Sequence, residues 1–308
     1  MNGNASASAR MGTLRGGLIL AGFLVLTVPL MPVQAALLRW SPTGARKFPH
    51  WYHKRVCRLM GIRLEIEGEV ARDKPVLLVA NHTSWLDIPV LSAVAPVSFV
   101  AKKEVGSWPF VSALARLQRS VFVDRARRTA VGETANEILA RLAGGDAIVL
   151  FAEGTSSDGN RVLPFMTSLF AAAKPSAKSG PDASAGPAPE AVVQTLSVVY
   201  TRLHGIPLGR ADRPFVGWYG DMEMQSHAWR LLKSGPLDVR IRIGPQVPLS
   251  SFADRKDLAR RSEAEVREQV VRILRSRARD EPVVIAAPEN AAPVRPRPGT
   301  GGSSDKWV

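Results

Sequence analysis

Short apolar runs of strand length alternate along the chain with stretches whose apolar positions recur at helical spacing. The apolar runs predict strands at residues 75–80, 97–101, 119–125, 146–151, 196–201 and 239–243. Helices are expected at residues 88–94, 108–117, 128–143 and 254–279. Alternation of this kind is typical of a β-sheet covered by helices, so the pattern predicts an α/β fold.

The N-terminal part has a different pattern. Residues 16–38 carry no charge, and a stretch of about 23 residues is long enough to span a bilayer. A cleaved signal peptide is the competing interpretation, because residues 33–35 resemble a cleavage site. Basic residues are denser after the segment than before it, which predicts that the following domain is cytoplasmic. We therefore expect a retained membrane anchor over residues 1–45, which either crosses once or dips in and returns.

The overall charge narrows the choice of partners. Lysine and arginine number 41 against 27 acidic residues, which gives a net charge of +14 and a pI near 10.7. Such a charge suits nucleic acid, an anionic membrane surface or an acidic carrier protein. Aromatic residues are only 6% of the chain and are scattered, whereas a nucleic-acid site interleaves them with a basic patch. The single cysteine, Cys57, excludes an internal disulfide.

Two segments have compositions that favour irregular structure. Residues 174–189 are rich in alanine, serine, glycine and proline, and they predict a surface insertion between two strands. Residues 281–308 have a similar composition and are expected to form a disordered tail. The globular domain is therefore expected over residues 46–280.

A histidine and a carboxylate follow the apolar run at residues 75–80. His82 and Asp87 are five residues apart, so they would not share one face of a continuous helix. They can meet only if His82 lies in a turn and Asp87 lies in the helix that follows, with Thr83 or Ser84 as its N-cap. An aspartate bonded to one imidazole nitrogen leaves the other nitrogen as a general base. The alternative is a buried histidine that is paired for stability.

Two more strands are followed by polar groups. The run at residues 146–151 leads into Glu153 and Gly154, and the run at residues 119–125 ends in Asp124 and Arg125. Ligand crevices of α/β folds lie at the carboxyl ends of strands. Together with the pair at His82, these groups therefore predict an active site at one edge of the sheet.

Three blocks of this sequence, in order, resemble the motifs of the glycerolipid acyltransferase family. The family motifs are NHxxxxD, which matches residues 81–87, a segment ending in F-[IV]-D-R, which matches 122–125, and FPEGTRS, which stands in this chain as FAEGTSS at 151–157. The likeness covers roughly residues 75–200 and implies a mixed β-sheet covered by helices. It also implies direct acyl transfer with His82 as base and Asp87 as its partner, without a metal or bound cofactor. By the same resemblance, the acceptor pocket includes Asp124, Arg125, Glu153, Gly154, Thr155 and Ser156.

The departures from these motifs concern the acceptor. The family has arginine where this chain has Ser156, and it commonly has lysine where this chain has Met166. Serine cannot bind phosphate bidentately as a guanidinium does. The departures therefore favour an acceptor without a terminal phosphate, although Arg161 can substitute for the missing cation.

One branch of the family fits such an acceptor. Residues 151–161, 200–205 and 218–222 resemble the bacterial lyso-ornithine lipid acyltransferases, which implies lyso-ornithine lipid as acceptor and acyl-acyl carrier protein as donor. Acylation of lysophosphatidic acid to phosphatidic acid is the alternative reaction, and acyl-CoA is the alternative donor. The expected partners are membrane lysolipids and acyl carrier protein, without nucleic acid, at the cytoplasmic side of the inner membrane.

Other classes fit less well. A serine hydrolase requires Gly-x-Ser-x-Gly, which residues 154–158 do not provide. A zinc site could recruit His50, His53 and His82, but the chain has no His-Glu-x-x-His pair. The non-enzyme alternative is a membrane adaptor of the same fold that binds lysolipid without turnover.

Overall fold

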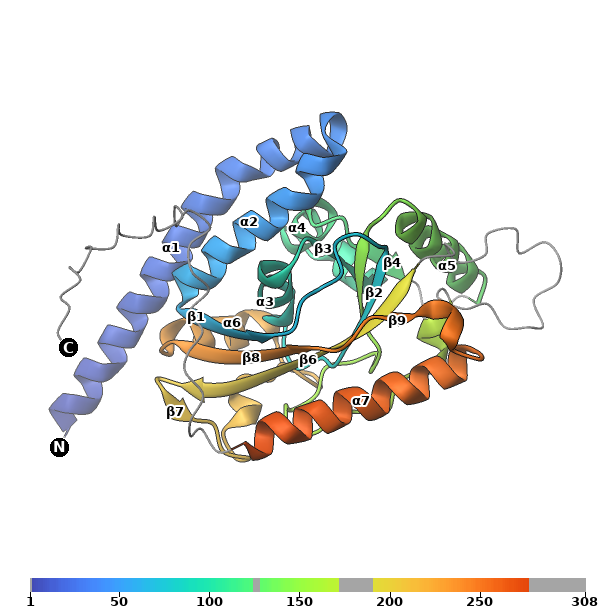
Figure 1. The fold of residues 1–308 in the computed structure, drawn as a ribbon. Coiled ribbons are helices and arrows are strands. Elements are labelled where there is room, and N and C mark those ends of the chain that lie inside the picture. Colours follow the sequence, from blue (N-terminus) through green and yellow to red (C-terminus); the bar gives the residue numbers. More distant parts are fainter. Residues whose placement is uncertain (1, 124–127, 172–190, 277–308) are drawn as a thin grey trace, which may run out of the picture.

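A central β-sheet organises the computed structural model, which describes residues 2–123, 128–171 and 191–276 (Figure 1). The strands are β1 (Ile62–Glu67), β2 (Val76–Ala80), β3 (Val97–Lys102), β4 (Val121–Val123), β5 (Ala147–Phe151), β6 (Val192–Leu203), β7 (Ile206–Pro207), β8 (Leu237–Ile243) and β9 (Val247–Pro248). Their order is β1-β8-β6-β2-β5-β3-β4, with β7 and β9 paired to β6. The expected insertion at residues 174–189 and the tail at 281–308 lie outside the described residues.

The sheet is mixed, as the resemblance implied. Neighbouring strands from β4 to β6 are parallel, whereas β8 is antiparallel to β6 and parallel to β1. All five residues of β2 are buried, and such continuous apolar runs are typical of parallel strands covered on both faces. The register aligns Ala80 at the end of β2 with Phe151 of β5 and Leu196 of β6. The residues after Ala80 therefore begin beside the end of β5, and they lie next to β6, which continues to Leu203.

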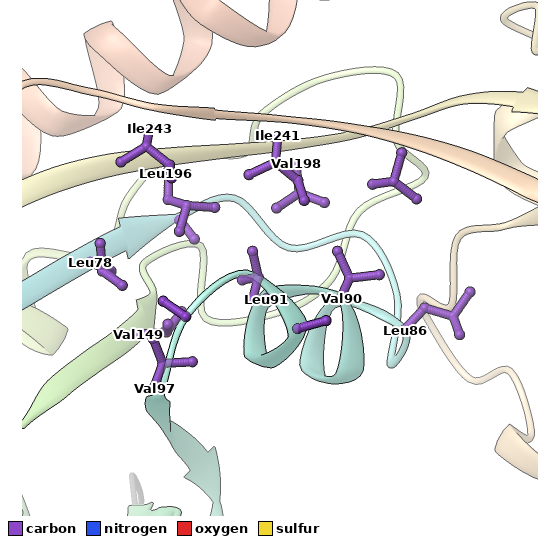
Figure 2. Close-up of a cluster of buried hydrophobic side chains, with 14 of the residues drawn as sticks. Leu78, Leu86, Val90, Leu91, Val97, Val149, Leu196, Val198, Ile241 and Ile243 are labelled. Atoms are coloured by element: carbon purple, nitrogen blue, oxygen red, sulfur yellow. The ribbon is translucent and has the colours of Figure 1, made fainter. Parts of the chain in front are cut away.

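The helices cover both faces of this sheet. They are α1 (Asn2–Trp40), α2 (Pro42–Met60), α3 (Asp87–Val94), α4 (Val111–Leu117), α5 (Arg128–Ala143), α6 (Met224–Lys233) and α7 (Arg255–Arg275). On one face, α3 packs its leucine and valine side chains against β2, β6 and β8, and Figure 2 shows Val90 and Leu91 beneath Val198 and Ile241. Burial of each such side chain contributes about 1.5–3 kcal/mol. Because Asp87 begins α3, this packing fixes its backbone.

The opposite face has its own core. There, α7 packs Leu258, Val266 and Val270 against the sheet, and α5 adds Ile138 and Leu142. In Figure 1, α7 crosses the face of the sheet that lies away from α1 and α2.

Helix α1 lies along the outside of the domain. It is continuous through Pro29 and Pro32 and runs antiparallel to α2, which returns the chain to β1 (Figure 1). Among the described residues, the segment Arg10–Trp40 is long and apolar enough to cross a membrane. Its large apolar residues that remain exposed in the protein are Met11, Leu14, Leu18, Leu20, Leu24, Val25, Val28, Val33, Leu38 and Trp40.

Candidate active site

His82 and Asp87 meet at the carboxyl end of β2. His82 lies in the turn after the strand, and Asp87 is the first residue of α3, as the sequence predicted. His82 Nδ1 lies 2.7 Å from Asp87 Oδ2. Because a carboxylate can only accept, Nδ1 carries the proton and donates it, so Nε2 keeps the lone pair that can take a proton.

The Asp87 carboxylate is completely buried and accepts several hydrogen bonds. Its Oδ2 also accepts the backbone N–H groups of Thr83, at 2.7 Å, and Ser84, at 3.0 Å. The expectation that Thr83 or Ser84 caps α3 is wrong, because Leu86 occupies the N-cap position. Instead, the Asp87 carboxylate binds backbone N–H groups of the turn before α3 and holds that turn at the N-terminus of the helix. A negative charge is favoured there by the helix dipole.

Neighbouring strands hold the turn that carries His82. The imidazole stacks on the Phe151 ring with 4.1 Å between centroids, and 18% of the His82 side chain is exposed. The His82 carbonyl accepts the Ser157 N–H at 2.9 Å. Asn81 bonds the Val198 backbone twice, with Nδ2 donating to the carbonyl at 2.9 Å and Oδ1 accepting the N–H at 2.8 Å. These contacts join β2, β5 and β6 around the histidine.

Glu153 acts on the backbone of the same turn. Its Oε1 accepts the His82 N–H and its Oε2 accepts the Leu163 N–H, each at 3.0 Å. Burial raises the pKa of this carboxyl to about 8, and the negative charge of Asp87 acts in the same direction, whereas the two amide donors oppose it. The geometry therefore makes Glu153 a brace for the His82 turn.

The other residues of the FPEGTRS-like block differ in their surroundings. The Gly154 backbone has a φ of 72°, which favours glycine, and its N–H donates to the Phe151 carbonyl at 3.2 Å. Thr155 is exposed. The Ser156 hydroxyl donates to the Trp218 carbonyl, and the Trp218 N–H donates to the Thr83 carbonyl at 2.9 Å. Ser156 thus ties the loop at residue 218 to the histidine motif.

Two arginines lie close to this motif. Arg161 and Arg213 line a small hollow together with Thr83, Gly159 and Tyr200. The predicted substitute Arg161 is therefore near the site, and Arg213 is a residue that the sequence analysis missed. Short-range spacing gave no signal for it, because the fold brings it to Thr83 from far along the chain.

Arg213 is partly desolvated. Its Nη1 donates to Asn160 Oδ1 at 3.0 Å, and among the described residues its buried Nε is left without a hydrogen-bond partner. Burial lowers the pKa of this guanidinium from its usual value, and the nearby charge of Arg210 adds to the effect. An anion at the hollow would supply the missing acceptor for Arg213 Nε.

Asp124 and Arg125, which were predicted for the acceptor pocket, lie outside the described residues.

The arrangement combines a candidate proton acceptor with two arginines that line a water-sized hollow next to Thr83. The paired imidazole can deprotonate a hydroxyl, and the arginines can hold a carboxylate or phosphate close to it.

Comparisons with known proteins agree with this chemistry. A family model described as acyltransferase matches residues 61–185. The lyso-ornithine lipid O-acyltransferase of Brucella abortus (strain 2308) is 47% identical over 257 residues, covering 83% of this chain and 94% of that protein. The protein of the same name from Rhizobium meliloti (strain 1021) is 42% identical over 262 residues, covering 84% and 88%.

A solved structure has the same fold. The crystal structure of the 1-acyl-sn-glycerophosphate acyltransferase from Thermotoga maritima matches with a TM-score of 0.61 at 23% identity, covering 89% of this chain and 99% of that one. The chain therefore belongs to the glycerolipid acyltransferase family, in the branch of the lyso-ornithine lipid O-acyltransferases, and it is a lysolipid acyltransferase.

Proposed function

We propose that this enzyme transfers a fatty acyl group from acyl-acyl carrier protein to the hydroxyl of lyso-ornithine lipid, forming ornithine lipid. The observation that carries the proposed acceptor is the identity of 47% and 42%, over more than four fifths of the chain, to two proteins named lyso-ornithine lipid O-acyltransferase. The His82–Asp87 pair supports the chemistry, because the hydrogen bond to Asp87 holds the proton on Nδ1 and leaves Nε2 as the nitrogen that can accept a proton.

His82 acts as the general base in the proposed reaction. Its Nε2 takes the proton of the acceptor hydroxyl while the hydroxyl oxygen forms a bond to the thioester carbonyl carbon. The resulting tetrahedral intermediate breaks its carbon–sulfur bond, and the departing thiolate takes the proton from the imidazolium. Asp87 stabilises the positive imidazolium between the two transfers. The reaction needs no metal or bound cofactor.

Arg161 and Arg213 are proposed to bind the headgroup of the acceptor. The α-carboxylate of lyso-ornithine lipid lies only a few covalent bonds from the reacting hydroxyl, and a planar guanidinium binds a carboxylate bidentately. The buried, unpartnered Nε of Arg213 supports this role among the described residues. The same arginines could bind the phosphate of lysophosphatidic acid, which keeps that acceptor as the alternative.

Incubation of the membrane-bound enzyme with both acceptors tests the proposed substrate. Equal amounts of lyso-ornithine lipid and lysophosphatidic acid compete for limiting acyl-acyl carrier protein, and mass spectrometry identifies the products. We expect ornithine lipid as the main product. Predominant phosphatidic acid would contradict the proposed acceptor and assign the arginines to phosphate.

The donor is proposed to be acyl-acyl carrier protein on the resemblance to the lyso-ornithine lipid acyltransferases, and the net charge of +14 suits an acidic carrier. Parallel assays with acyl-CoA separate the two donors. A higher kcat/KM with acyl-CoA would contradict the proposal.

We propose that α1 lies in one leaflet of the inner membrane, at its cytoplasmic face, without crossing it. Near one end, Arg15 donates to the Met60 carbonyl of α2 at 2.9 Å. It also donates to the carbonyls of Leu232, in α6, and Ser234, the C-cap of that helix. Near the other end, Gln34 donates to the Leu117 carbonyl of α4 at 2.8 Å. A helix held to one domain at both ends supports in-plane insertion, because a crossing helix would carry one end away from the domain.

Cysteine labelling tests this arrangement. In a Cys57→Ser background, single cysteines replace the exposed residues Arg10, Arg39 and, as a domain reference, Lys256. A membrane-impermeant maleimide is expected to label all three from the cytoplasmic side of vesicles. Labelling of Arg10→Cys from the opposite side to the other two would contradict the in-plane arrangement and favour a crossing helix.

A further inference from the structure

A third side chain completes the hydrogen bonding of the His82–Asp87 pair. The Tyr200 hydroxyl lies 2.7 Å from Asp87 Oδ1, and because the carboxylate can only accept, the hydroxyl donates. Tyr200 is 4% exposed and Asp87 is 0% exposed, so both groups are removed from bulk water. Each carboxylate oxygen thus has a side-chain donor, with Tyr200 on Oδ1 and His82 on Oδ2.

The fold aims Tyr200 at this carboxylate. Asn81, the residue before His82, bonds both backbone groups of Val198 and so aligns the end of β2 with β6. Tyr200 is two residues beyond Val198, which puts its side chain on the same face of the sheet, toward α3. The pairing register of β6 shifts between Tyr200 and Arg202, and such bulges orient side chains next to active sites.

The Tyr200 hydroxyl is suited to remain a donor. Burial raises the pKa of this phenol well above its usual value, and the negative charge of Asp87 raises it further. Deprotonation is therefore suppressed in the working pH range, and the hydroxyl is available to share the charge of the carboxylate.

We propose that Tyr200 is a positioning residue for acyl transfer, acting through Asp87. Its hydrogen bond holds the carboxylate in the orientation that receives His82 Nδ1 and takes up part of the negative charge. With that charge shared, Asp87 stabilises the imidazolium less strongly than it would without the hydroxyl, so loss of the hydroxyl is expected to favour the protonated imidazole. This inference rests on the proposed role of His82 as the base and is independent of which lysolipid is the acceptor.

Other titratable groups face this cluster and define the controls. From α2, the buried Cys57 acts on Tyr200, and burial raises the pKa of its thiol to about 12. After β5, Glu153 lies near Asp87, and it is influenced in turn by Arg267 of α7. Burial raises the pKa of Glu153 to about 8, so its ionisation affects the alkaline side of the pH–rate profile. It does not affect the acid limb, which is the rise in rate with pH on the acid side of that profile.

The pH dependence of Tyr200→Phe tests the proposal. Rates are measured from pH 5.5 to 9 on the full chain in membranes, with whichever lysolipid the wild-type enzyme acylates. Without the hydroxyl, we expect kcat to fall about 10-fold, KM to stay within about 2-fold, and the acid limb to move about 0.5–1 pH unit higher. The matched control is Tyr52→Phe, which removes a hydroxyl bonded at 2.7 Å to Thr27, away from the site, and is expected to leave the limb in place.

Each outcome has a defined meaning. No turnover by the wild-type enzyme would contradict the proposed function. That result is distinguishable from a failure of the proposed role of Tyr200, which appears only when the wild-type enzyme is active. Wild-type turnover with an unshifted acid limb in Tyr200→Phe would overturn the inference, even if the rate fell in proportion to the amount of folded protein.

A second measurement covers the case in which Tyr200→Phe does not fold. The chain has three tyrosines, so Tyr52→Phe and Tyr219→Phe together leave Tyr200 as the single site for fluorotyrosine incorporation. The more acidic fluorophenol keeps the shape and donates a stronger hydrogen bond, so the acid limb is expected to move lower. An unchanged limb in this folded, labelled protein would overturn the inference.

Discussion

At the scale of single residues, the site depends on what each polar side chain is bonded to. Of the predicted site residues in the described part of the chain, His82 and Asp87 form a direct pair, whereas Glu153 and Ser156 bind backbone groups around that pair. These backbone contacts explain how residues of one sequence block can affect catalysis without touching the reacting atoms. Variants of the His82–Asp87 pair are therefore expected to change the chemistry, whereas variants of the arginines are expected to change substrate binding.

Arg213→Gln is predicted to weaken acceptor binding. Loss of the guanidinium removes a charge-assisted hydrogen bond to the headgroup anion, so the KM for lysolipid is expected to rise about 10-fold with kcat within about 2-fold. Steady-state kinetics at fixed donor concentration measures both parameters. Arg210→Gln is the matched control, because Arg210 is an exposed neighbour. Equal effects of the two substitutions would show a general charge effect in place of a binding site.

Glu153→Gln is predicted to flatten the pH dependence of stability. The folded protein raises the pKa of this carboxyl from 4.5 to about 8, so folding takes up a proton between these values. The stability contribution is therefore complete below about pH 4.5 and is lost as the pH rises through 8, by about 1.4 kcal/mol per pH unit at most. Denaturant unfolding at pH 5 and pH 8 measures the difference.

The glutamine variant should lose most of that difference. It should also be about 1 kcal/mol less stable at pH 5, because the amide nitrogen cannot accept a backbone N–H. An unchanged difference in Glu153→Gln would show that another group carries the pH dependence.

At the scale of elements, the sequence predicted the parts of the fold whose pattern is set locally. Strands β2 and β5 were recognised because both faces of each are buried, which requires an uninterrupted apolar run. Helix α5 was predicted with its observed bounds, and α7 ends at Arg275, four residues before the expected end at residue 279.

Elements with weaker local patterns were missed. Helix α2 is rich in cations and contains Pro49, α6 has only ten residues, and β1 is an edge strand with charged residues along it. Their structure depends on packing against α1, α3 and β8, which local spacing does not reveal. The same limit applies to the site, since Tyr200 and Arg213 reach it through long-range contacts.

Arg15→Met is predicted to loosen one end of α1. The substitution removes the hydrogen bonds that join α1 to the ends of α2 and α6, while the contact of Gln34 with α4 is unaffected. Hydrogen exchange of the membrane-bound protein should therefore become faster near Arg15 and stay unchanged near Gln34. Arg10→Met, at an exposed arginine of the same helix, is the control and should change neither region. Faster exchange along the whole of α1 would contradict two separate attachments.

At the scale of the whole molecule, the enzyme combines an apolar helix with a strongly basic surface. The exposed apolar side chains of α1 lie on a helix that packs against α2, α4 and α6, so the candidate membrane-contacting helix is attached to the domain that carries the site. An active site held in this way can receive a lysolipid from the bilayer. The proposed donor, acyl-acyl carrier protein, approaches from water instead, where the charge of the enzyme acts on it.

Salt is therefore predicted to weaken the use of acyl-acyl carrier protein. Between 50 mM and 500 mM salt, the KM for this donor should rise several-fold at nearly constant kcat, because screening reduces the attraction between the basic enzyme and the acidic carrier. Steady-state rates at both salt concentrations measure the effect, and a short acyl thioester without the carrier is the control. A salt-independent KM would contradict electrostatic recruitment.

The central claim is that His82 removes the proton of the acceptor hydroxyl during acyl transfer. The most direct measurement is the initial rate of transfer to lyso-ornithine lipid by wild type and His82→Ala, with lysolipid binding measured in parallel. A general base contributes about 10²- to 10⁴-fold, so the variant should lose at least about 100-fold in rate while binding lysolipid with similar affinity. Retention of the rate within a few-fold of wild type would contradict the role of His82.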